Sequence, residues 1–183
     1  WINAGFLSIT TIEKLLKTGK KIFWFMHDMW PMTGGCHFSL ECEKYTQSCG
    51  ACPLLHSHSE KDFSYYILQS KKNHWKHYNN LQLITPSAWL AKCSKDSSLF
   101  EDFPVHVIPN YLDFSIFFPV DKMEARKQLF LPLDKKLILF GADGGTGNSY
   151  KGGKILLHAM QNFRRSDTEL ICFGSDRGMA AEL

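Results

Sequence analysis

The sequence has no long apolar run and no strong charge of either sign. No run reaches the roughly 18 consecutive apolar residues that a membrane-spanning helix needs, and the chain does not open with the segments of a secretory signal peptide. The 21 Lys and Arg residues against 18 Asp and Glu residues give a formal net charge of +3. Because nucleic-acid binding usually requires a concentrated basic face, we expect no nucleic-acid partner. Contact with an anionic membrane surface stays open.

An initiator methionine is also absent, since the chain begins with Trp1-Ile2-Asn3. We therefore expect the chain to be a piece of a longer protein. At 183 residues the piece is long enough for one ordinary domain or two small lobes. Its content of 44% hydrophobic and 14% aromatic residues can build a core, so the composition does not favour disorder.

Short apolar runs alternate with amphipathic segments along the whole chain. The runs predict strands at 21–26, 81–85, 105–108, 137–141 and 169–174. Strands that alternate with helices are typical of an α/β fold with parallel sheets. The first run is continuously apolar rather than alternating, so we expect a strand that is covered on both faces. A segment of weak periodicity that is flanked by prolines, 109–120, marks the expected boundary between two lobes.

Capping residues predict where the helices begin. The expected helices follow Thr10, Asp62 and Ser87 and cover 121–130 and 151–163. The helix after Asp62 is expected to bury one side, formed by Phe63, Tyr66, Ile67, Trp75 and Tyr78.

A glycine-rich loop, Gly141 to Gly153, lies between an expected strand and an expected helix. In open α/β sheets, ligands bind beyond the carboxyl ends of the strands, where helix N-termini offer free N–H groups and a positive dipole. Glycines let the backbone approach a phosphate, and Lys151 would add a full positive charge. The pattern fits neither a P-loop, because Ile155 stands where Ser or Thr is needed, nor the dinucleotide-binding fingerprint. A surface loop with a solvated lysine remains the alternative.

His27 directly follows the first expected strand, at the ligand-binding edge of the sheet. A histidine there can bond a sugar hydroxyl or stabilise charge that develops near a leaving group. The alternative is a structural histidine, and Asp28 beside it has a loop cap as its alternative role.

Four of the six cysteines cluster: Cys36, Cys42, Cys49 and Cys52. The last two form a C-x-x-C pair, which supplies two thiolates to one side of a metal ion, and two further thiolates would complete a tetrahedral Zn²⁺ site. The spacings of five and six residues between the other cysteines are not those of zinc ribbons. Three interpretations remain open: a structural metal, free buried thiols and disulfides. The reserve ligands nearby are His37, His56 and His58.

Seven short segments together resemble the retaining GT-B glycosyltransferases of family 4 (group 1 type), in their bacterial polysaccharide-biosynthesis branch. The segments are Trp1-Ile2-Asn3-Ala4-Gly5-Phe6-Leu7-Ser8, His27-Asp28-Met29-Trp30-Pro31-Met32-Thr33-Gly34-Gly35-Cys36-His37, Cys49-Gly50-Ala51-Cys52-Pro53, Thr85-Pro86-Ser87-Ala88-Trp89-Leu90, Val107-Ile108-Pro109-Asn110-Tyr111-Leu112-Asp113, Lys151-Gly152 and Phe173-Gly174. The histidine- and cysteine-containing segments are specific, whereas the Pro-Asn and Lys-Gly segments recur across many GT-B enzymes.

The resemblance implies two Rossmann-like lobes. Residues 1–110 would form part of the N-terminal, acceptor-side lobe, 111–120 the crossing between lobes, and 121–183 the start of the C-terminal, donor-binding lobe. It implies transfer of a sugar, with anomeric retention, from a nucleotide-sugar donor to a glycan or lipid-linked glycan acceptor. Such an enzyme would be cytoplasmic, peripheral at the inner membrane, and would need no metal cofactor for catalysis. Zinc at the cysteines would then be structural.

The resemblance also assigns residues. His27 matches the histidine near the transferred sugar, and Lys151 the lysine that neutralises the donor diphosphate. The remaining donor-binding candidates are the loop glycines Gly141, Gly144, Gly145 and Gly152. Two departures stand out. Ala142 occupies a position where related enzymes commonly carry arginine, and the family's glutamate-containing motif would fall beyond Leu183. We therefore expect the piece not to catalyse transfer by itself.

Overall fold

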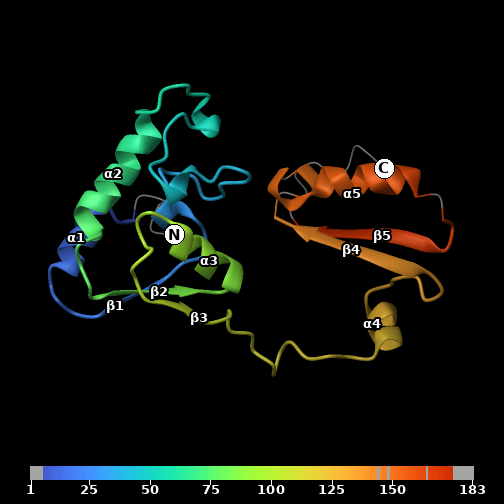
Figure 1. Ribbon diagram of the computed structural model, residues 1–183. Coiled ribbons are helices and arrows are strands. Elements are labelled where there is room, and N and C mark those ends of the chain that lie inside the picture. The colour runs from blue at the N-terminus through green and yellow to red at the C-terminus, as the bar shows by residue number, and fades with distance from the viewer. Residues whose placement is uncertain (1–5, 144, 148, 164, 175–183) are drawn as a thin grey trace. The chain divides into compact units, whose positions relative to one another are not determined.

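The structure is a computed structural model that describes residues 6–143, 145–147, 149–163 and 165–174. The chain forms two compact units, Trp1–Leu112 and Asp113–Leu183. Each unit contains parallel strands with helices between them (Figure 1). The α/β class and the five predicted strands are confirmed.

The first unit is built on a three-stranded parallel sheet in the order β1-β2-β3. The strands are β1 (Ile22–Phe25), β2 (Leu81–Thr85) and β3 (Val105–Val107). The helices between and before them are α1 (Ile9–Leu16), α2 (Phe63–Trp75) and α3 (Ala88–Asp96). Residues 26–62, between β1 and α2, are all described and largely irregular. Their regular structure consists of three short 3₁₀ turns, η2 (Trp30–Met32), η3 (Lys44–Thr46) and η4 (Pro53–Leu55).

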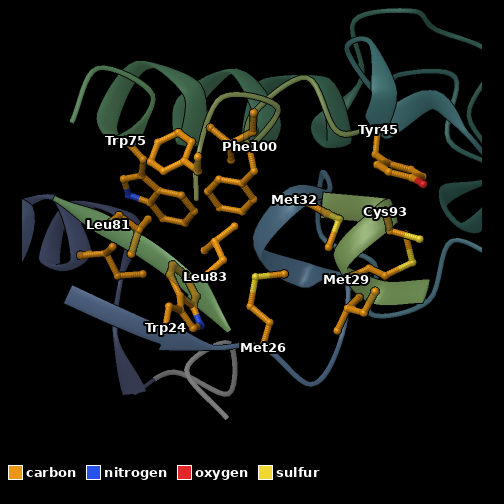
Figure 2. Close-up of a cluster of buried hydrophobic side chains, with 14 of the residues drawn as sticks. Trp24, Met26, Met29, Met32, Tyr45, Trp75, Leu81, Leu83, Cys93 and Phe100 are labelled. Atoms are coloured by element: carbon orange, nitrogen blue, oxygen red, sulfur yellow. The ribbon is translucent and has the colours of Figure 1, made fainter. Parts of the chain in front are cut away.

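A hydrophobic core fills the space between one face of this sheet and the helices (Figure 2). Trp24, Leu81 and Leu83 are its buried strand residues, and Trp75 enters from α2. The rings of Trp24 and Trp75 meet edge to face, with centroids 5.5 Å apart. Burial of a large apolar side chain stabilises a fold by roughly 1.5–3 kcal/mol, so each of these residues contributes to the stability of the unit.

The other face of β1 is open in the described part of the chain. Phe23 is 59% exposed and Phe25 is 38% exposed, whereas Trp24 between them is buried. The expectation that this strand is covered on both faces is therefore wrong here. The run is apolar throughout, but successive side chains of a strand point to opposite faces, and the helices of the unit cover one of them.

In the first unit, two details of the helices differ from the sequence-based predictions. The cap of α1 is Ser8 rather than Thr10, because Ser8 has the extended backbone of an N-cap and its hydroxyl accepts the Thr11 N–H at 3.1 Å. In α2, which Asp62 caps as predicted, Phe63 and Tyr66 of the expected buried side are exposed. The buried face of α2 is instead formed by Ser64, Leu68, Lys71 and Trp75.

The second unit pairs two parallel strands, β4 (Lys136–Ala142) and β5 (Thr168–Gly174). Its helices are α4 (Lys122–Gln128) and α5 (Gly153–Asn162), and two 3₁₀ turns, η5 (Gly145–Gly147) and η6 (Ser149–Lys151), lie between β4 and α5. The helix predicted at 151–163 begins two residues later than expected, since Gly152 has a left-handed backbone (φ 75°) and serves as its N-cap.

Candidate functional site

The carboxyl ends of β1, β2 and β3 bring three of the recognised segments to one edge of the sheet. Parallel pairing aligns Phe25 with Ile84 and Thr85 with Val107. The ladder continues past the strands, because the Ile108 N–H donates to the Thr85 carbonyl at 2.9 Å. The segments that begin at His27, Thr85 and Val107 therefore leave the sheet on the same side. This is the edge at which open α/β sheets bind ligands.

His27 lies at this edge with its side chain exposed. Its ring stacks on Phe25 of β1, with centroids 4.9 Å apart and an interplanar angle of 24°. The residues on either side, Met26 and Asp28, are both buried. The structure thus presents an accessible imidazole on a backbone that is anchored on both sides.

Asp28 organises the segment that follows. One carboxylate oxygen accepts the Trp30 N–H at 2.9 Å, and the other lies 2.9 Å from Nδ1 of His37. The His37 carbonyl accepts the Met29 N–H at 2.9 Å and closes the segment into a loop. Asp28 therefore acts as a loop cap. His37, a reserve metal ligand by sequence, is engaged with this carboxylate.

Lys71 holds the same loop from α2. Its side chain is fully buried, and its ammonium group donates to the carbonyl oxygens of Trp30 and Thr33, the latter at 2.9 Å. The ammonium also lies 3.8 Å from the centroid of the Trp30 ring. Burial lowers the pKa of Lys71 to about 7, while negative charge on Cys49, Cys36 and Asp28 would act in the opposite direction.

The four clustered cysteines surround one pocket of about 280 Å³. Cys36, Cys42, Cys49 and Cys52 all line it, and the rest of its wall includes Leu54, Leu55 and Phe63. All are free thiols. In the described part of the chain, no three His, Cys, Asp or Glu side chains are placed so that they could hold a metal ion together. The structure therefore gathers the four thiols without closing them into a metal-binding group.

Burial sets the chemistry of these thiols. It raises the pKa of Cys36, and it raises the pKa of Cys49 to about 11, against the opposing effect of a hydrogen bond from the Gly34 N–H. A thiol with a raised pKa is a weak nucleophile at neutral pH. These properties fit a structural role better than a catalytic one.

The N-terminus of α2 fixes the C-x-x-C turn. The Asp62 carboxylate accepts the Cys52 N–H at 2.8 Å, and the Ser64 hydroxyl accepts the Gly50 N–H at 3.1 Å. Hydrogen bonds, first among them one from the Ser64 hydroxyl, lower the pKa of Asp62. A side chain at Gly50 would place its Cβ 2.0 Å from the Glu60 carbonyl oxygen. The turn therefore packs against the segment before α2 with no spare room.

Three described glycines of the loop in the second unit occupy positions that disfavour a side chain, one through close packing and two through their backbone conformation. A Cβ at Gly141 would lie 2.1 Å from the Phe173 ring, and Gly145 and Gly152 have left-handed φ values of 58° and 75°. Lys151 is exposed at the end of η6, immediately before the cap of α5. The loop therefore places a cation beside the N-terminus of a helix, where anions are favoured. Gly144, the fourth glycine candidate, lies outside the described residues.

Two partial sites follow from this geometry, one in each unit. His27 lies at the sheet edge of the first. In the second, Gly141 lies near the end of β4, and Gly145, Lys151 and Gly152 follow the strand. Sequence reasoning missed Lys71. The missed signal is its spacing from Ser64, Leu68 and Trp75, which places a lysine on the buried face of α2.

No helix in the described ranges is long and apolar enough to cross a membrane. Comparisons with known protein families and with solved structures find no match. The chain is similar to a protein of Escherichia coli (strain K12) named "Putative colanic acid biosynthesis glycosyl transferase WcaC", with 28% identity over 122 residues. The matched stretch covers 63% of this chain and 29% of that protein. The chain is thus distantly similar to part of a protein named as a glycosyl transferase, and it spans less than a third of that relative's length.

Proposed function

We propose that this chain is part of a glycosyltransferase that moves a sugar from a nucleotide-sugar donor to a glycan acceptor. The observation that carries the proposal is the gathering of the His27, Thr85 and Val107 segments at one sheet edge. That edge binds ligands in open α/β sheets. The similarity over 122 residues to a protein named as a glycosyl transferase of colanic acid biosynthesis supports the same class of reaction and a polysaccharide product.

The donor diphosphate would bind over the loop from Gly141 to Gly152. Backbone N–H groups at the start of α5 would donate to its oxygens, and the helix dipole would favour its charge. Lys151 would supply the full positive charge, and it carries more of that task because Ala142 contributes none. The glycines, Gly144 included, would let the backbone approach the phosphates closely.

In the transfer step, the bond between the anomeric carbon and the diphosphate breaks, and the nucleoside diphosphate leaves with the electron pair. A new bond forms from an acceptor hydroxyl oxygen to that carbon with retention of configuration, and the hydroxyl proton is released. His27 would contact the transferred sugar and stabilise the transition state. We propose a GT-B arrangement of two Rossmann-like lobes and a glycan or lipid-linked acceptor, handled at the cytoplasmic face of the inner membrane.

The first test is donor affinity in the full-length protein. Lys151→Ala should weaken the binding of UDP- or GDP-sugars by roughly 10- to 150-fold, since a charge-assisted contact contributes on the order of 1.5–3 kcal/mol. Lys127→Ala is the control, because Lys127 is an exposed lysine of α4, outside the glycine-rich loop and α5. Isothermal titration would measure both. Equal donor affinity in the wild type and Lys151→Ala would remove the phosphate role.

The second test is turnover with a glycolipid acceptor. His27→Ala should lower kcat more than it changes donor affinity, because the imidazole would face the sugar and not the nucleotide. His58→Ala is a suitable control, since His58 is an exposed histidine outside the sheet edge. Wild-type turnover in His27→Ala would make that histidine a structural residue, and no transfer from any nucleotide sugar by the wild type would contradict the proposed function.

We also propose that Cys36, Cys42, Cys49 and Cys52 hold a structural Zn²⁺. Four soft thiolates are a complete donor set for this ion, and all four side chains already line one pocket. Binding would draw the thiols inward, because no three of them are placed as a metal group in the described structure. The metal would release the protons that burial otherwise retains.

Elemental analysis tests this site without reference to activity. We expect about one equivalent of zinc to co-purify, and Cys49→Ser to lose it and destabilise the first unit. Cys93→Ser should keep the zinc, because Cys93 lies in α3 and is not one of the residues that line the pocket. A metal-free protein with four thiols that titrate freely would contradict the zinc proposal. Zinc without any binding of a nucleotide sugar would favour the alternative function, a non-catalytic metal-binding interaction module.

A further inference from the structure

The buried face of α2 carries a lysine where its neighbours are packed side chains. Leu68 and Trp75, one turn before and one turn after Lys71, are fully buried in the core of the first unit. Lys71 is equally buried. Burying an ammonium group is costly unless hydrogen bonds compensate, and an apolar side chain of similar length could fill the same volume. The charge therefore calls for a reason other than packing.

The hydrogen bonds of Lys71 supply that reason. Its ammonium group donates to the carbonyl oxygens of Trp30 and Thr33 and lies over the Trp30 ring. Trp30 is the first residue of η2 and Thr33 is its C-cap, and the Thr33 N–H also donates to the Trp30 carbonyl at 3.4 Å. Lys71 therefore binds the carbonyl groups at both ends of this turn. Lys71 thus joins α2 to the turn directly after His27 and Asp28.

The loop that Lys71 holds is closed within itself. Asp28 links Trp30 to His37, and the Thr33 hydroxyl donates to the Cys36 carbonyl at 2.7 Å. It also lies directly on α2 at a second point, because a Cβ at Gly34 would be 2.2 Å from the Ser64 carbonyl oxygen. A loop with internal closure and two attachments to one helix moves with that helix as one body.

We propose that Lys71 is the positioning residue that fixes His27 for the transfer reaction. The inference rests on the proposed function, in which His27 contacts the transferred sugar. Among the described residues, the aromatic contact of the His27 ring is the stack on Phe25. Its backbone is held between two buried residues, Met26 and Asp28. Lys71 holds the loop that buries Asp28, and a shift of that loop would displace the imidazole without removing any group that touches substrate.

The test compares three variants by two readouts. Lys71→Met keeps a side chain of similar length but removes the N–H donors and the charge. Lys71→Gln keeps a neutral N–H donor on a shorter side chain. Lys92→Met is the control, because Lys92 forms an exposed ion pair with Asp96 on α3. The first readout is the NMR signal of the His27 ring in the chain 1–183, assigned with His27→Gln. The second is kcat and KM of the full-length enzyme.

We expect Lys71→Met to shift and broaden the NMR signal of His27. It should lower kcat on the order of 10- to 100-fold and leave the donor KM within about threefold of the wild type. The reason is that a displaced catalytic group slows the reaction more than it weakens binding. Lys92→Met should match the wild type in both readouts. If Lys71→Met does not fold, the same effects are expected in Lys71→Gln.

A folded Lys71 variant with an unshifted His27 signal and wild-type kcat would overturn the inference. So would equal losses of kcat in Lys71→Met and Lys92→Met. A wild-type enzyme that transfers no sugar would contradict the proposed function instead, and the His27 signal would still report whether Lys71 positions this ring. The two failures are therefore distinguishable.

Discussion

The two units of the chain contrast in how much of their apolar surface they bury. The first unit has sixteen buried hydrophobic residues in one core cluster, whereas Ala142 is the single buried hydrophobic residue among the described residues of the second. In β2, Leu83 is fully buried, but Leu139 of β4 is 66% exposed. The same strand–helix pattern in sequence therefore accompanies a packed unit and a thinly packed one.

Because of this difference in packing, the two candidate sites have supports that differ in burial. His27 stands on a loop whose supports, Asp28 and Lys71, are buried in the packed unit. Lys151 is exposed at the end of η6, in a unit that buries little apolar surface. The preceding turn, η5, is held by the close approach of the buried Thr146 to Gly153, where a Cβ would lie 2.5 Å from the Thr146 Cα. Regions with few buried apolar contacts open at low free-energy cost. We therefore expect the His27 loop to be pre-organised and the Lys151 loop to be ordered further by its ligand.

The largest test of the contrast is a matched pair of leucine truncations. Leu83→Ala should lower the free energy of unfolding of the first unit by about 3–5 kcal/mol, because it leaves a cavity in the core. Leu139→Ala should change stability by less than about 0.5 kcal/mol, since an exposed side chain leaves none. All five tryptophans lie in residues 1–112, so tryptophan fluorescence during denaturation reports on the first unit.

Circular dichroism over the same denaturation would follow both units. Two transitions, with the fluorescence change confined to the more stable one, would show that the first unit is the more stable of the two. Comparable losses of stability in Leu83→Ala and Leu139→Ala would contradict the difference in burial between the two units, because they would mean that Leu139 is buried in solution.

The second test uses the pH dependence that Lys71 gives the packed unit. Burial holds the pKa of Lys71 at about 7, whereas an unfolded lysine titrates near 10.4. Between these values the unfolded chain binds more protons than the folded one, so this residue makes stability rise with pH. From about pH 6 to about pH 9, the wild type should gain on the order of 2 kcal/mol relative to Lys71→Met.

The comparison with Lys71→Met isolates this effect. The acidic groups whose charge would raise the pKa of Lys71 are Cys49, Cys36 and Asp28. The raised pKa values of the two thiols lower stability as pH rises above about 8.5, but both thiols are present in both proteins. Urea denaturation of the pair at several pH values measures the difference. A difference that does not change with pH would show that the Lys71 ammonium is solvated.

The five strands were predictable because short apolar runs bounded by turn residues are typical of strands in a buried sheet. The sequence did not predict which face each element buries. The apolar residues Phe63 and Tyr66 of α2 are exposed, while Ser64 and Lys71 are buried, and hydrophobicity cannot indicate a polar residue that tertiary hydrogen bonds satisfy. The same holds for β1, where Phe23 and Trp24 are both apolar and only one is buried.

The candidate sites were predictable to the extent that they follow strand ends. His27 was identified because it ends a strand, and the glycine-rich loop because it follows another. The supports were not, since Lys71 lies far from His27 in sequence and reaches its loop only through the packing of α2. The cysteine cluster was visible in the spacing, but the common pocket that its members line depends on turns anchored by Asp62 and Ser64.

The smallest change in stability is expected when a helix cap is removed, and each unit offers one such cap. The Ser87 hydroxyl accepts the Leu90 N–H at 3.3 Å in α3, and Asp121 accepts the N–H groups of Met123 and Glu124 in α4. Ser87→Ala should lower the free energy of unfolding of the first unit by about 1 kcal/mol, because α3 packs on β2 and β3 and unfolds with them.

Asp121→Ala should instead act locally. The seven-residue helix α4 is too short to be stable without tertiary support, so loss of its cap should speed amide hydrogen exchange in α4 and leave the tryptophan-detected transition unchanged. Hydrogen-exchange mass spectrometry on both variants measures this difference. If Asp121→Ala also lowered the stability of the first unit, α4 would have to unfold together with the core of residues 1–112, and the two units would behave as one cooperative structure.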